Sequence, residues 1–416
     1  MVQNYEVLAT LSSFDKLKGV KRQRFHSFCT TFANMKPQIV VGLDAKRIVR
    51  NGTGLGSYGR TLANDLSAFA QLDLRLYAPD EGREVLKQQV AERENLHYVY
   101  PQGGCSLLPA AMRKAWWRSH GIVPQMVTDG VQVFHGLSGE LPIGIRKAGI
   151  KTVVTIHDLI FMRHPEYYNR IDVEIYKRKF FSTLREADRI VAISECTRRD
   201  IAELGGIPEE KIDLVYQSCA PRFSAQVADE KLQAVRQQYQ LPQRYILGVG
   251  SIEERKNMLL ALKALHELDA DICLVLVGKK TSYAKRLQKY AAQNGLADRL
   301  LLLHGVPDDD LPAIYVGAEV FVYPSRYEGF GIPVIEAIRM GLPVVACTGS
   351  CLEEAGGPHN LYVDPDDAQA MAAAISKSMI GCEGRDERIA LSREYVRRFE
   401  NNGCADQFVR IYQELV

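Results

Sequence analysis

The chain has 416 residues, 46% of them apolar, and its 52 Lys and Arg nearly cancel its 50 Asp and Glu. This length suits two or three domains, each with a sizeable core. The balanced charge gives no argument for a nucleic-acid partner, for which a strongly basic face is expected. No apolar run approaches the roughly 20 residues that a membrane-spanning helix needs.

Nine cysteines show neither a CxxC pair nor a zinc-ligand spacing. Such usage is typical of free thiols in a reducing compartment, so we predict a cytoplasmic protein. Residues 1–36 are basic but lack a continuous apolar stretch before a cleavage site, which predicts a poorly ordered extension instead of a secretory signal. Met35 lies just before the first strand-like run, so we expect it to be the native start and residues 1–34 to be dispensable.

Short apolar runs alternate with helical stretches, a pattern that predicts parallel sheets covered by helices. In the first half these runs are 39–45, 74–78, 97–100, 131–136, 151–158 and 189–194. After a polar stretch the pattern restarts with 245–250, 272–278, 300–305, 320–325 and 343–348. Two Rossmann-like, doubly wound α/β domains are therefore predicted, with a ligand in the cleft beyond the carboxyl ends of their strands.

The predicted boundaries divide the chain into five parts. They are the extension at 1–36, an N-terminal domain at 37–220, a linker at 221–243, a C-terminal domain at 244–395 and a helix at 396–416 that packs back on the N-terminal domain.

The segment "PSRYEGFGIPVIEA" places Glu328 in a loop and Glu336 inside a helix that begins near Pro333. The unpaired N–H groups at the start of that helix, next to two glycines, suit a phosphate. Glu336, about one turn in, can accept hydrogen bonds from hydroxyl groups such as those of a ribose. A second interpretation is that Glu336 only favours the helix dipole and Glu328 only caps a turn.

Two cations follow the first strand of the second half. In "GVGSIEERKN", Arg255 and Lys256 come at the carboxyl end of that strand, where a guanidinium and an ammonium can clamp a diphosphate. The alternative is a solvated first helical turn.

In the first half, "NGTGLGSYGRTLANDL" contains a GxGxxG spacing at Gly54, Gly56 and Gly59. A dinucleotide fingerprint requires this loop directly after the first strand, and here about eight residues intervene. We therefore interpret it as a phosphate or sugar cradle. His157, in "TIHDLIF", is placed to bind a sugar hydroxyl or move a proton, unless it is only a satisfied strand-end histidine.

Two further segments carry weaker signals. Asp308, Asp309 and Asp310 precede the helical stretch "LPAIYVGA", so we interpret them as an N-terminal cap and predict no metal site. Residues 110–120, "AAMRKAWWRSH", combine cations with Trp116 and Trp117, which suits a helix on an anionic membrane surface or one with a partly buried aromatic face.

Six segments together resemble a known family. They are "DAKRIVRNGTGLGSYGR", "FHGLSGELP", "IHDLIFMRHPEYY", "ADRIVAISECTRRDI", "GVGSIEERKN" and "VYPSRYEGFGIPVIEAIRMGLPVVA". From about residue 38 to its end, the chain resembles the retaining GT-B glycosyltransferases of family 4 (group 1). It is most similar to the bacterial mannosyltransferase-like branch that makes surface polysaccharides.

The resemblance implies transfer of a hexose, with mannose favoured, from a nucleotide diphosphate sugar to a hydroxyl of a glycan or lipid-linked acceptor. GDP-mannose is the favoured donor and UDP-glucose the next, with the anomeric configuration retained and no metal or other cofactor. Such an enzyme would lie in the cytoplasm, with peripheral contact at the inner face of the membrane through residues 110–120.

It also implies roles for particular residues. Arg255 and Lys256 would neutralise the leaving diphosphate, Glu328 would touch the donor sugar, and His157 would touch a donor hydroxyl near the anomeric centre. The donor-binding set would be Gly54, Gly56, Gly278, Lys279, Val306, Phe330, Gly331, Ile332 and Glu336. The family often has Asn or Gln, then Gly, a variable residue and Asp near the end of the first domain, where this chain has Gln217, Ser218, Cys219 and Ala220.

Retention suggests a covalent intermediate on a carboxylate, and Glu328 is the only candidate nucleophile that the sequence offers. We favour front-side attack, in which the leaving phosphate helps to deprotonate the acceptor. Three other functions stay open: a nucleotide-sugar epimerase or hydrolase, a dinucleotide oxidoreductase, and a non-catalytic sugar-nucleotide-binding protein.

Overall fold

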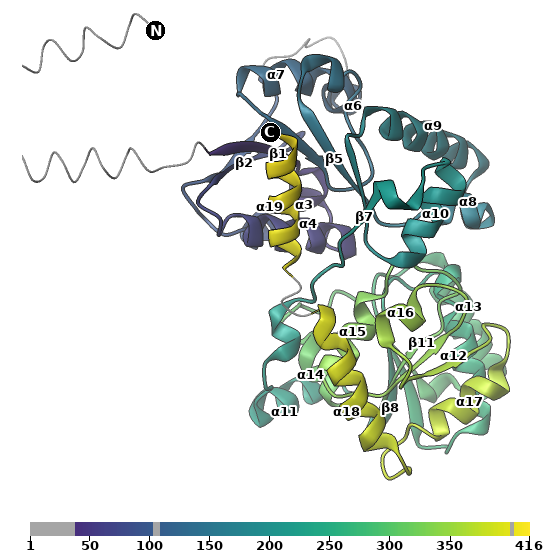
Figure 1. Cartoon of the computed structure of the whole chain (residues 1–416). Coiled ribbons are helices and arrows are strands. Elements are labelled where there is room, and N and C mark those ends of the chain that lie inside the picture. The colour runs from purple at the N-terminus through teal and green to yellow at the C-terminus, as the bar shows by residue number, and fades with distance from the viewer. Residues whose placement is uncertain (1–37, 103–108, 400–402) are drawn as a thin grey trace, which may run out of the picture.

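The computed structural model describes residues 38–102, 109–399 and 403–416. The expected extension and the start at Met35 lie outside these residues. The described chain forms two α/β domains, one above the other in Figure 1, as the repeated strand pattern predicts.

The N-terminal domain has a seven-stranded parallel sheet in the order β3-β2-β1-β4-β5-β6-β7. Its strands are β1 (Ile39–Asp44), β2 (Leu72–Tyr77), β3 (Leu96–Val99), β4 (Val133–Gly136), β5 (Lys151–Ile156), β6 (Arg189–Ala192) and β7 (Ile212–Leu214). The strand order reverses between β1 and β4, which is where sheets of this kind bind ligands.

The C-terminal domain repeats the plan with six strands, in the order β10-β9-β8-β11-β12-β13. They are β8 (Arg244–Val249), β9 (Ile272–Val277), β10 (Leu300–Leu303), β11 (Val320–Tyr323), β12 (Val344–Cys347) and β13 (Leu361–Val363). Helices cover both faces of each sheet, so the central strands are continuous apolar runs such as "ICLVLV" of β9. The edge strands β7 and β13 have three residues each, and the sequence pattern did not predict them.

Helices fill the connections between strands. In the N-terminal domain they are α3 (Lys46–Arg50), α4 (Gly54–Leu66), α5 (Glu84–Lys87), α6 (Ala110–Trp116), α7 (Ile122–Thr128), α8 (Ile160–Arg163), α9 (Arg170–Glu186) and α10 (Glu195–Gly205). In the C-terminal domain they are α11 (Asp229–Gln238), α12 (Met258–Ala264), α13 (Ser282–Gln293), α14 (Leu311–Val316), α15 (Ile332–Arg339), α16 (Leu352–Gly356), α17 (Ala368–Ser376) and α18 (Arg385–Val396). No described helix is long and apolar enough to cross a membrane.

The segment 221–243, which the sequence marks as a linker, is folded onto the C-terminal domain. Its helix α11 packs against α14 and buries Val235 in the core of that domain. Just after α11, the Tyr239 hydroxyl donates a hydrogen bond of 2.6 Å to Asp310 Oδ2. These residues therefore pack as part of the C-terminal domain.

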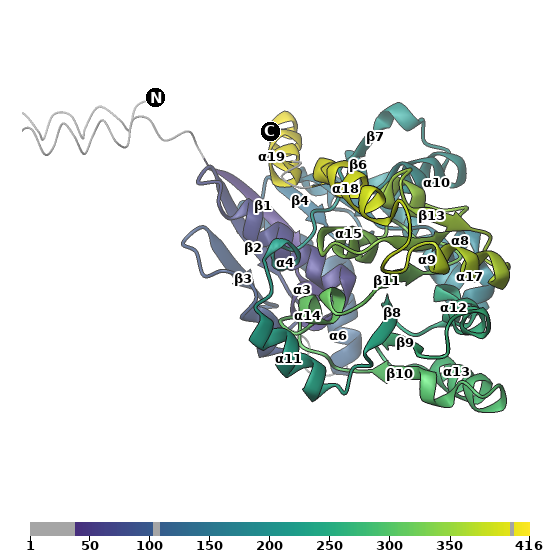
Figure 2. The same cartoon turned by 90° about the horizontal axis from the view of Figure 1, so that it is seen from below.

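The last helix, α19 (Cys404–Leu415), lies on the N-terminal domain, whereas α18 lies on the C-terminal domain (Figure 1). Phe408 and Tyr412 of α19 are fully buried in the N-terminal core, and α19 packs against α4. The Tyr412 hydroxyl is 2.7 Å from His135 Nδ1 at the end of β4. The chain thus connects the two domains a second time at its C-terminal end. Seen from below, α19 stays beside β1 and β4, and α18 stays beside α15 (Figure 2).

Candidate functional site

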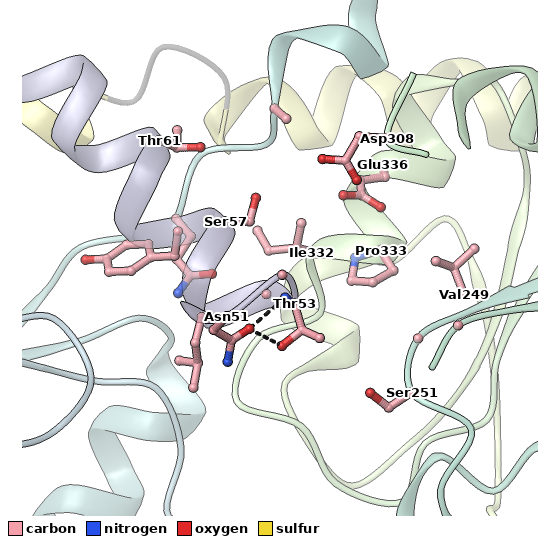
Figure 3. Close-up of a pocket in the computed structure, with 18 of the residues that line it drawn as sticks. Asn51, Thr53, Ser57, Thr61, Val249, Ser251, Asp308, Ile332, Pro333 and Glu336 are labelled. Atoms are coloured by element: carbon pink, nitrogen blue, oxygen red, sulfur yellow. Dashed lines mark hydrogen bonds between the residues drawn. The ribbon is translucent and has the colours of Figure 1, made fainter. Parts of the chain in front are cut away.

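A cavity of about 970 Å³ lies between the domains, at the carboxyl ends of strands from both sheets. The N-terminal domain contributes α3 and α4, and the C-terminal domain contributes the loop after β8 and the start of α15. In Figure 3, Thr53, the N-cap residue of α4, and Ser57 of α4 face Ile332 and Pro333 of α15. This is the place at which the repeated strand pattern predicts a ligand.

Arg255, Lys256 and Glu328 form a buried ion cluster in the wall of the cavity. Lys256 Nζ lies 2.6 Å and Arg255 Nη1 lies 2.9 Å from the same oxygen, Glu328 Oε1. Lys256 Nζ also donates to the hydroxyl of Tyr323 at 2.6 Å. Arg255 Nη2 also pairs with Glu253 Oε1 at 2.8 Å, so two cations are matched by two carboxylates, and all four side chains belong to residues that line the cavity.

The charges in this cluster stabilise one another. Burial raises the pKa of the Glu328 carboxyl, but Lys256 and Arg255 outweigh that effect and hold its pKa at about 2. Burial lowers the pKa of Lys256, and the Coulombic attraction of Glu328 outweighs it, so the pKa is raised above its ordinary value. All three groups are therefore charged at neutral pH.

Glu336, on α15, also lines the cavity. This helix begins at Ile332, after Gly331 in a left-handed conformation (φ 118°) and with Pro333 in its first turn, as the sequence predicts. The Tyr315 hydroxyl donates a 2.8 Å hydrogen bond to Glu336 Oε2. Burial raises the pKa of Glu336 to about 7, although the bond from Tyr315 lowers it.

Only one of the three residues predicted to bind phosphate through their backbone, residues 330–332, lines the cavity. Ile332 lines the cavity, but Phe330 and Gly331 do not. The Phe330 ring is buried in the core of the C-terminal domain, against Tyr216 and Phe399. Gly331 serves as the N-cap of α15 at a φ that favours glycine.

Gly54 and Gly56, the two glycines at the start of α4 that were predicted to bind the donor, differ in the same way. Gly54 lines the cavity with open space around its Cα, whereas Gly56 does not line it. A Cβ atom on Gly56 would lie 1.8 Å from the backbone oxygen of Asn51, so glycine is needed there for the tight turn between α3 and α4. Asn51 Oδ1 accepts hydrogen bonds from both the backbone N–H and the hydroxyl of Thr53 (Figure 3).

His157 lies behind the cavity wall and is not among its lining residues. Its Nε2 is 2.8 Å from the Leu137 carbonyl oxygen and its Nδ1 is 2.8 Å from Gln217 Nε2, and Tyr58 packs edge-on against the ring. The carbonyl requires a proton on Nε2, which leaves Nδ1 as an acceptor for the amide. Burial lowers the pKa of His157 to about 4, so the ring is neutral.

The three residues predicted near the nucleotide base, Gly278, Lys279 and Val306, all line the cavity. Gly278 follows β9, and a Cβ there would lie 1.7 Å from the Gly250 backbone oxygen. Only a residue without a side chain allows the loops after β8 and β9 to approach so closely.

Sequence reasoning did not assign several lining residues to the cavity. They include Arg47, Arg60, Arg83, Gln217, Arg222 and Asp308. Arg60 is buried and donates hydrogen bonds of 2.9 Å to the carbonyl oxygens of Ile48 and Asn51, so it shapes the loop ahead of α4. Two arginines within "KRIVR", directly after the first strand, were the signal that could have indicated a basic wall.

The prediction that the three aspartates cap a helix holds only for the position of Asp310. Asp310 occupies the N-cap position of α14, but its side chain makes no cap hydrogen bond. It binds Lys231, Tyr239 and Gln238 instead, and Asp308 pairs with Arg222 at 3.1 Å. Among the described residues, no group of three or more His, Cys, Asp or Glu side chains is arranged to hold a metal ion.

The two tryptophans of residues 110–120 have opposite environments. Trp116 is 59% exposed, whereas Trp117 is 7% exposed and donates its indole N–H to Gln125 Oε1 at 3.2 Å. Lys114 and Arg118 form ion pairs of 2.7 Å with Asp80 and Glu140. Trp117 therefore fits the interpretation of a partly buried aromatic face, and contact of the exposed Trp116 with a membrane stays a prediction.

Two doubly wound domains with a polar cavity between the carboxyl ends of their strands define the GT-B class of glycosyltransferases. The fold is shared with sucrose-phosphate synthase from Thermosynechococcus elongatus, at a TM-score of 0.74 and 21% identity over 91% of this chain and 99% of that one. Anabaena HepE, solved in complex with UDP and glucose, has a TM-score of 0.71 and 16% identity over 91% of this chain and 100% of its own.

Sequence comparisons give the family. Residues 231–393 match the model "Glycosyl transferases group 1" and residues 52–218 match "Glycosyltransferase Family 4". The O-antigen chain mannosyltransferase B of Escherichia coli is 31% identical over 68% of this chain and 74% of its own length. WbdA, a serotype-specific mannosyltransferase of Escherichia coli, is 29% identical over 60% of this chain, which spans only 32% of WbdA. The chain belongs to the family 4, group 1 glycosyltransferases, and it is an enzyme of that kind.

Proposed function

We propose that the chain transfers mannose, with retention of the anomeric configuration, from a nucleoside diphosphate mannose to a hydroxyl group of a surface-polysaccharide acceptor. The observation that carries the proposal is the pair Arg255 and Lys256, fixed by Glu328 in the wall of the interdomain cavity. The mannosyltransferase names of the two Escherichia coli relatives support mannose, with GDP-mannose as the favoured donor. UDP-glucose is the second choice, because HepE has been solved with UDP-glucose.

Glu336 would bind the ribose of the donor. Its Oε2 already accepts a hydrogen bond from the Tyr315 hydroxyl, which leaves Oε1 for a ribose hydroxyl. The base would lie against Gly278, Lys279 and Val306, at the ends of β9 and β10. These contacts all come from the C-terminal domain, so that domain would hold the nucleotide.

Arg255 and Lys256 would stabilise the leaving diphosphate. Negative charge grows on the phosphate oxygens as the bond to the sugar breaks, and fixed cations that need no reorganisation lower the barrier. The fixed guanidinium of Arg255 and ammonium of Lys256 would provide this stabilisation without a metal ion. Metal independence is therefore part of the proposal, and retention of activity in excess EDTA tests it.

We favour front-side attack for retention. Glu328 Oε1 is engaged by both Lys256 and Arg255, and the low pKa of the carboxyl makes it a weak nucleophile. In the proposed step, the bond from the anomeric carbon to the phosphate oxygen breaks, and the acceptor oxygen bonds to that carbon from the same face. The acceptor proton passes to the leaving phosphate. A trapped glycosyl adduct on Glu328 would overturn this mechanism.

The acceptor would enter from the N-terminal domain. We propose that it is a glycan or a lipid-linked glycan and that the enzyme meets it at the cytoplasmic face of a membrane, with the exposed Trp116 of α6 as the contact. Amphipathic helices with cations and an exposed aromatic residue bind anionic lipid surfaces in this way.

The function is tested with a panel of nucleotide sugars, by measuring nucleoside diphosphate release with and without an acceptor extract. Release from GDP-mannose that depends on the acceptor supports mannosyl transfer. Equal release without an acceptor indicates a hydrolase, interconversion of the sugar without release indicates an epimerase, and binding without turnover indicates a non-catalytic protein. Any of these three results would overturn the proposal.

A further inference from the structure

The loop that carries Glu328 is held on both sides by one helix of the other domain. On one side, the Tyr327 hydroxyl donates a 2.7 Å hydrogen bond to Asp200 Oδ2 on α10. On the other side, the Gly329 carbonyl oxygen accepts hydrogen bonds from Ser194 Oγ at 2.6 Å and Thr197 Oγ1 at 3.1 Å, at the start of α10. Glu328 thus lies between two residues that the N-terminal domain holds.

The contact at Gly329 is made by the backbone. A Cβ atom there would lie 1.9 Å from the backbone oxygen of His157, so glycine is needed for the two domains to approach this closely. Glu354 of α16 adds a third contact, because its carboxylate oxygens accept the backbone N–H groups of Glu195 at 2.7 Å and Cys196 at 3.3 Å. A carboxylate at the first turn of a helix is favoured by the helix dipole.

Tyr327 links this interdomain contact to the ion cluster. Its hydroxyl binds Asp200, and its carbonyl oxygen accepts a 2.6 Å hydrogen bond from Arg255 Nη1. The same Nη1 lies 2.9 Å from Glu328 Oε1. Asp200 is itself buried, and Arg163 Nε donates a 2.7 Å hydrogen bond to it. The residue of the N-terminal domain at which this chain of contacts begins is therefore held in place.

We propose that α10 is the element that sets the Glu328 loop in its working position, and that Asp200, acting through Tyr327, is a positioning residue for Arg255 and Glu328. The ion cluster is then complete only while the two domains are closed on each other. Closure would couple binding of the acceptor, on the N-terminal domain, to stabilisation of the leaving group, on the C-terminal domain. This inference rests on the proposed function, in which the cluster meets the donor diphosphate.

The test compares two full-length variants that lose the same kind of bond. Tyr327→Phe removes a tyrosine-to-aspartate hydrogen bond between the domains, and Tyr239→Phe removes one of 2.6 Å, to Asp310, within the C-terminal domain. With GDP-mannose and acceptor, we expect kcat of Tyr327→Phe to fall about 10- to 100-fold, the range for losing one hydrogen bond to a charged group. Its affinity for GDP and its binding stoichiometry should stay within about twofold of the wild type, because the nucleotide contacts remain. Tyr239→Phe should keep the wild-type kcat.

Two further measurements complete the test. Asp200→Asn combined with Tyr327→Phe should lower kcat no more than the larger single effect, because both changes break one chain of contacts. Amide hydrogen exchange at 253–257 and 326–331 should rise in Tyr327→Phe and not in Tyr239→Phe, whatever donor the enzyme uses. Unchanged exchange in Tyr327→Phe, or a kcat equal to that of Tyr239→Phe, would overturn the inference. A wild type that turns over no nucleotide sugar would overturn the proposed function, while the exchange experiment still decides on α10.

Discussion

Lys256 Nζ lies 2.6 Å from Glu328 Oε1, and both residues are only 8% exposed. Replacing Lys256 with Met should lower kcat by about 10²- to 10³-fold, the usual cost of losing one group that stabilises transition-state charge. It should also destabilise the fold by about 3 kcal/mol, because Glu328 loses one buried partner. Steady-state kinetics and chemical unfolding measure the two effects separately.

Lys231→Met is the control for that experiment, since Lys231 pairs with Asp310 in the same domain but does not line the cavity. We expect it to keep the wild-type kcat. Comparable turnover by Lys256→Met and the wild type, at matched folded fractions, would contradict the role of the cluster.

The elevated pKa of Glu336, about 7, predicts a specific dependence of stability on pH. The folded state holds this proton more tightly than the unfolded chain, where the ordinary value is 4.5. The stabilisation is therefore fully present below pH 4.5 and is lost as the pH rises through 7. Glu336→Gln cannot ionise and still offers an oxygen to Tyr315, so it should gain on the order of 1–3 kcal/mol over the wild type between pH 4.5 and pH 8. Urea unfolding at pH 4.5 and pH 8 measures the difference in unfolding free energy between Glu336→Gln and the wild type. The same difference at both pH values would refute the prediction.

Much of the fold follows from the sequence, because buried parallel strands appear in it as short, continuous apolar runs separated by helical stretches. The strands β8, β9 and β11 lie where those runs predict them, and α15 begins beside Pro333 as expected. The strands β7 and β13 were missed because three residues at a sheet edge carry too little periodicity to be recognised.

The candidate site was predicted less completely, because a motif does not show which of its residues face a cavity. Glu328 and Lys256 are brought together as the motifs imply, but Phe330 turns into the core. Gln217 begins the segment in which the family's Gly and Asp are missing, yet it lines the cavity and binds His157. Such contacts join residues far apart in the chain, and local sequence carries no record of them.

Gly54 and Gly56, in the first turn of α4, give a steric prediction that does not depend on substrate. Gly56→Ala would place its methyl group 1.8 Å from the Asn51 carbonyl oxygen, so the turn must open and the fold should lose about 2–4 kcal/mol. Gly54→Ala meets no atom within 4 Å and should gain up to about 1 kcal/mol from helix propensity. Thermal unfolding distinguishes them.

If Gly54 also forms part of a phosphate cradle, Gly54→Ala should weaken GDP-mannose binding in calorimetry even though the fold is more stable. Unchanged affinity would remove Gly54 from the donor site, and a stable Gly56→Ala would contradict the packing argument.

The membrane proposal can be tested by replacing the exposed Trp116, with the buried Trp117 beside it as the control. Trp116→Ala should reduce binding to vesicles that contain phosphatidylglycerol by about tenfold and leave the unfolding free energy within about 0.5 kcal/mol, because Trp116 packs little against the fold. Trp117→Ala should cost about 3–5 kcal/mol of stability, since it leaves a cavity beside Ile122 and Met126. Vesicle co-sedimentation in low and high salt separates apolar insertion from attraction by the neighbouring cations. A wild type that does not bind these vesicles at low salt would end the membrane proposal, and equal binding by wild type and Trp116→Ala would move the contact away from α6.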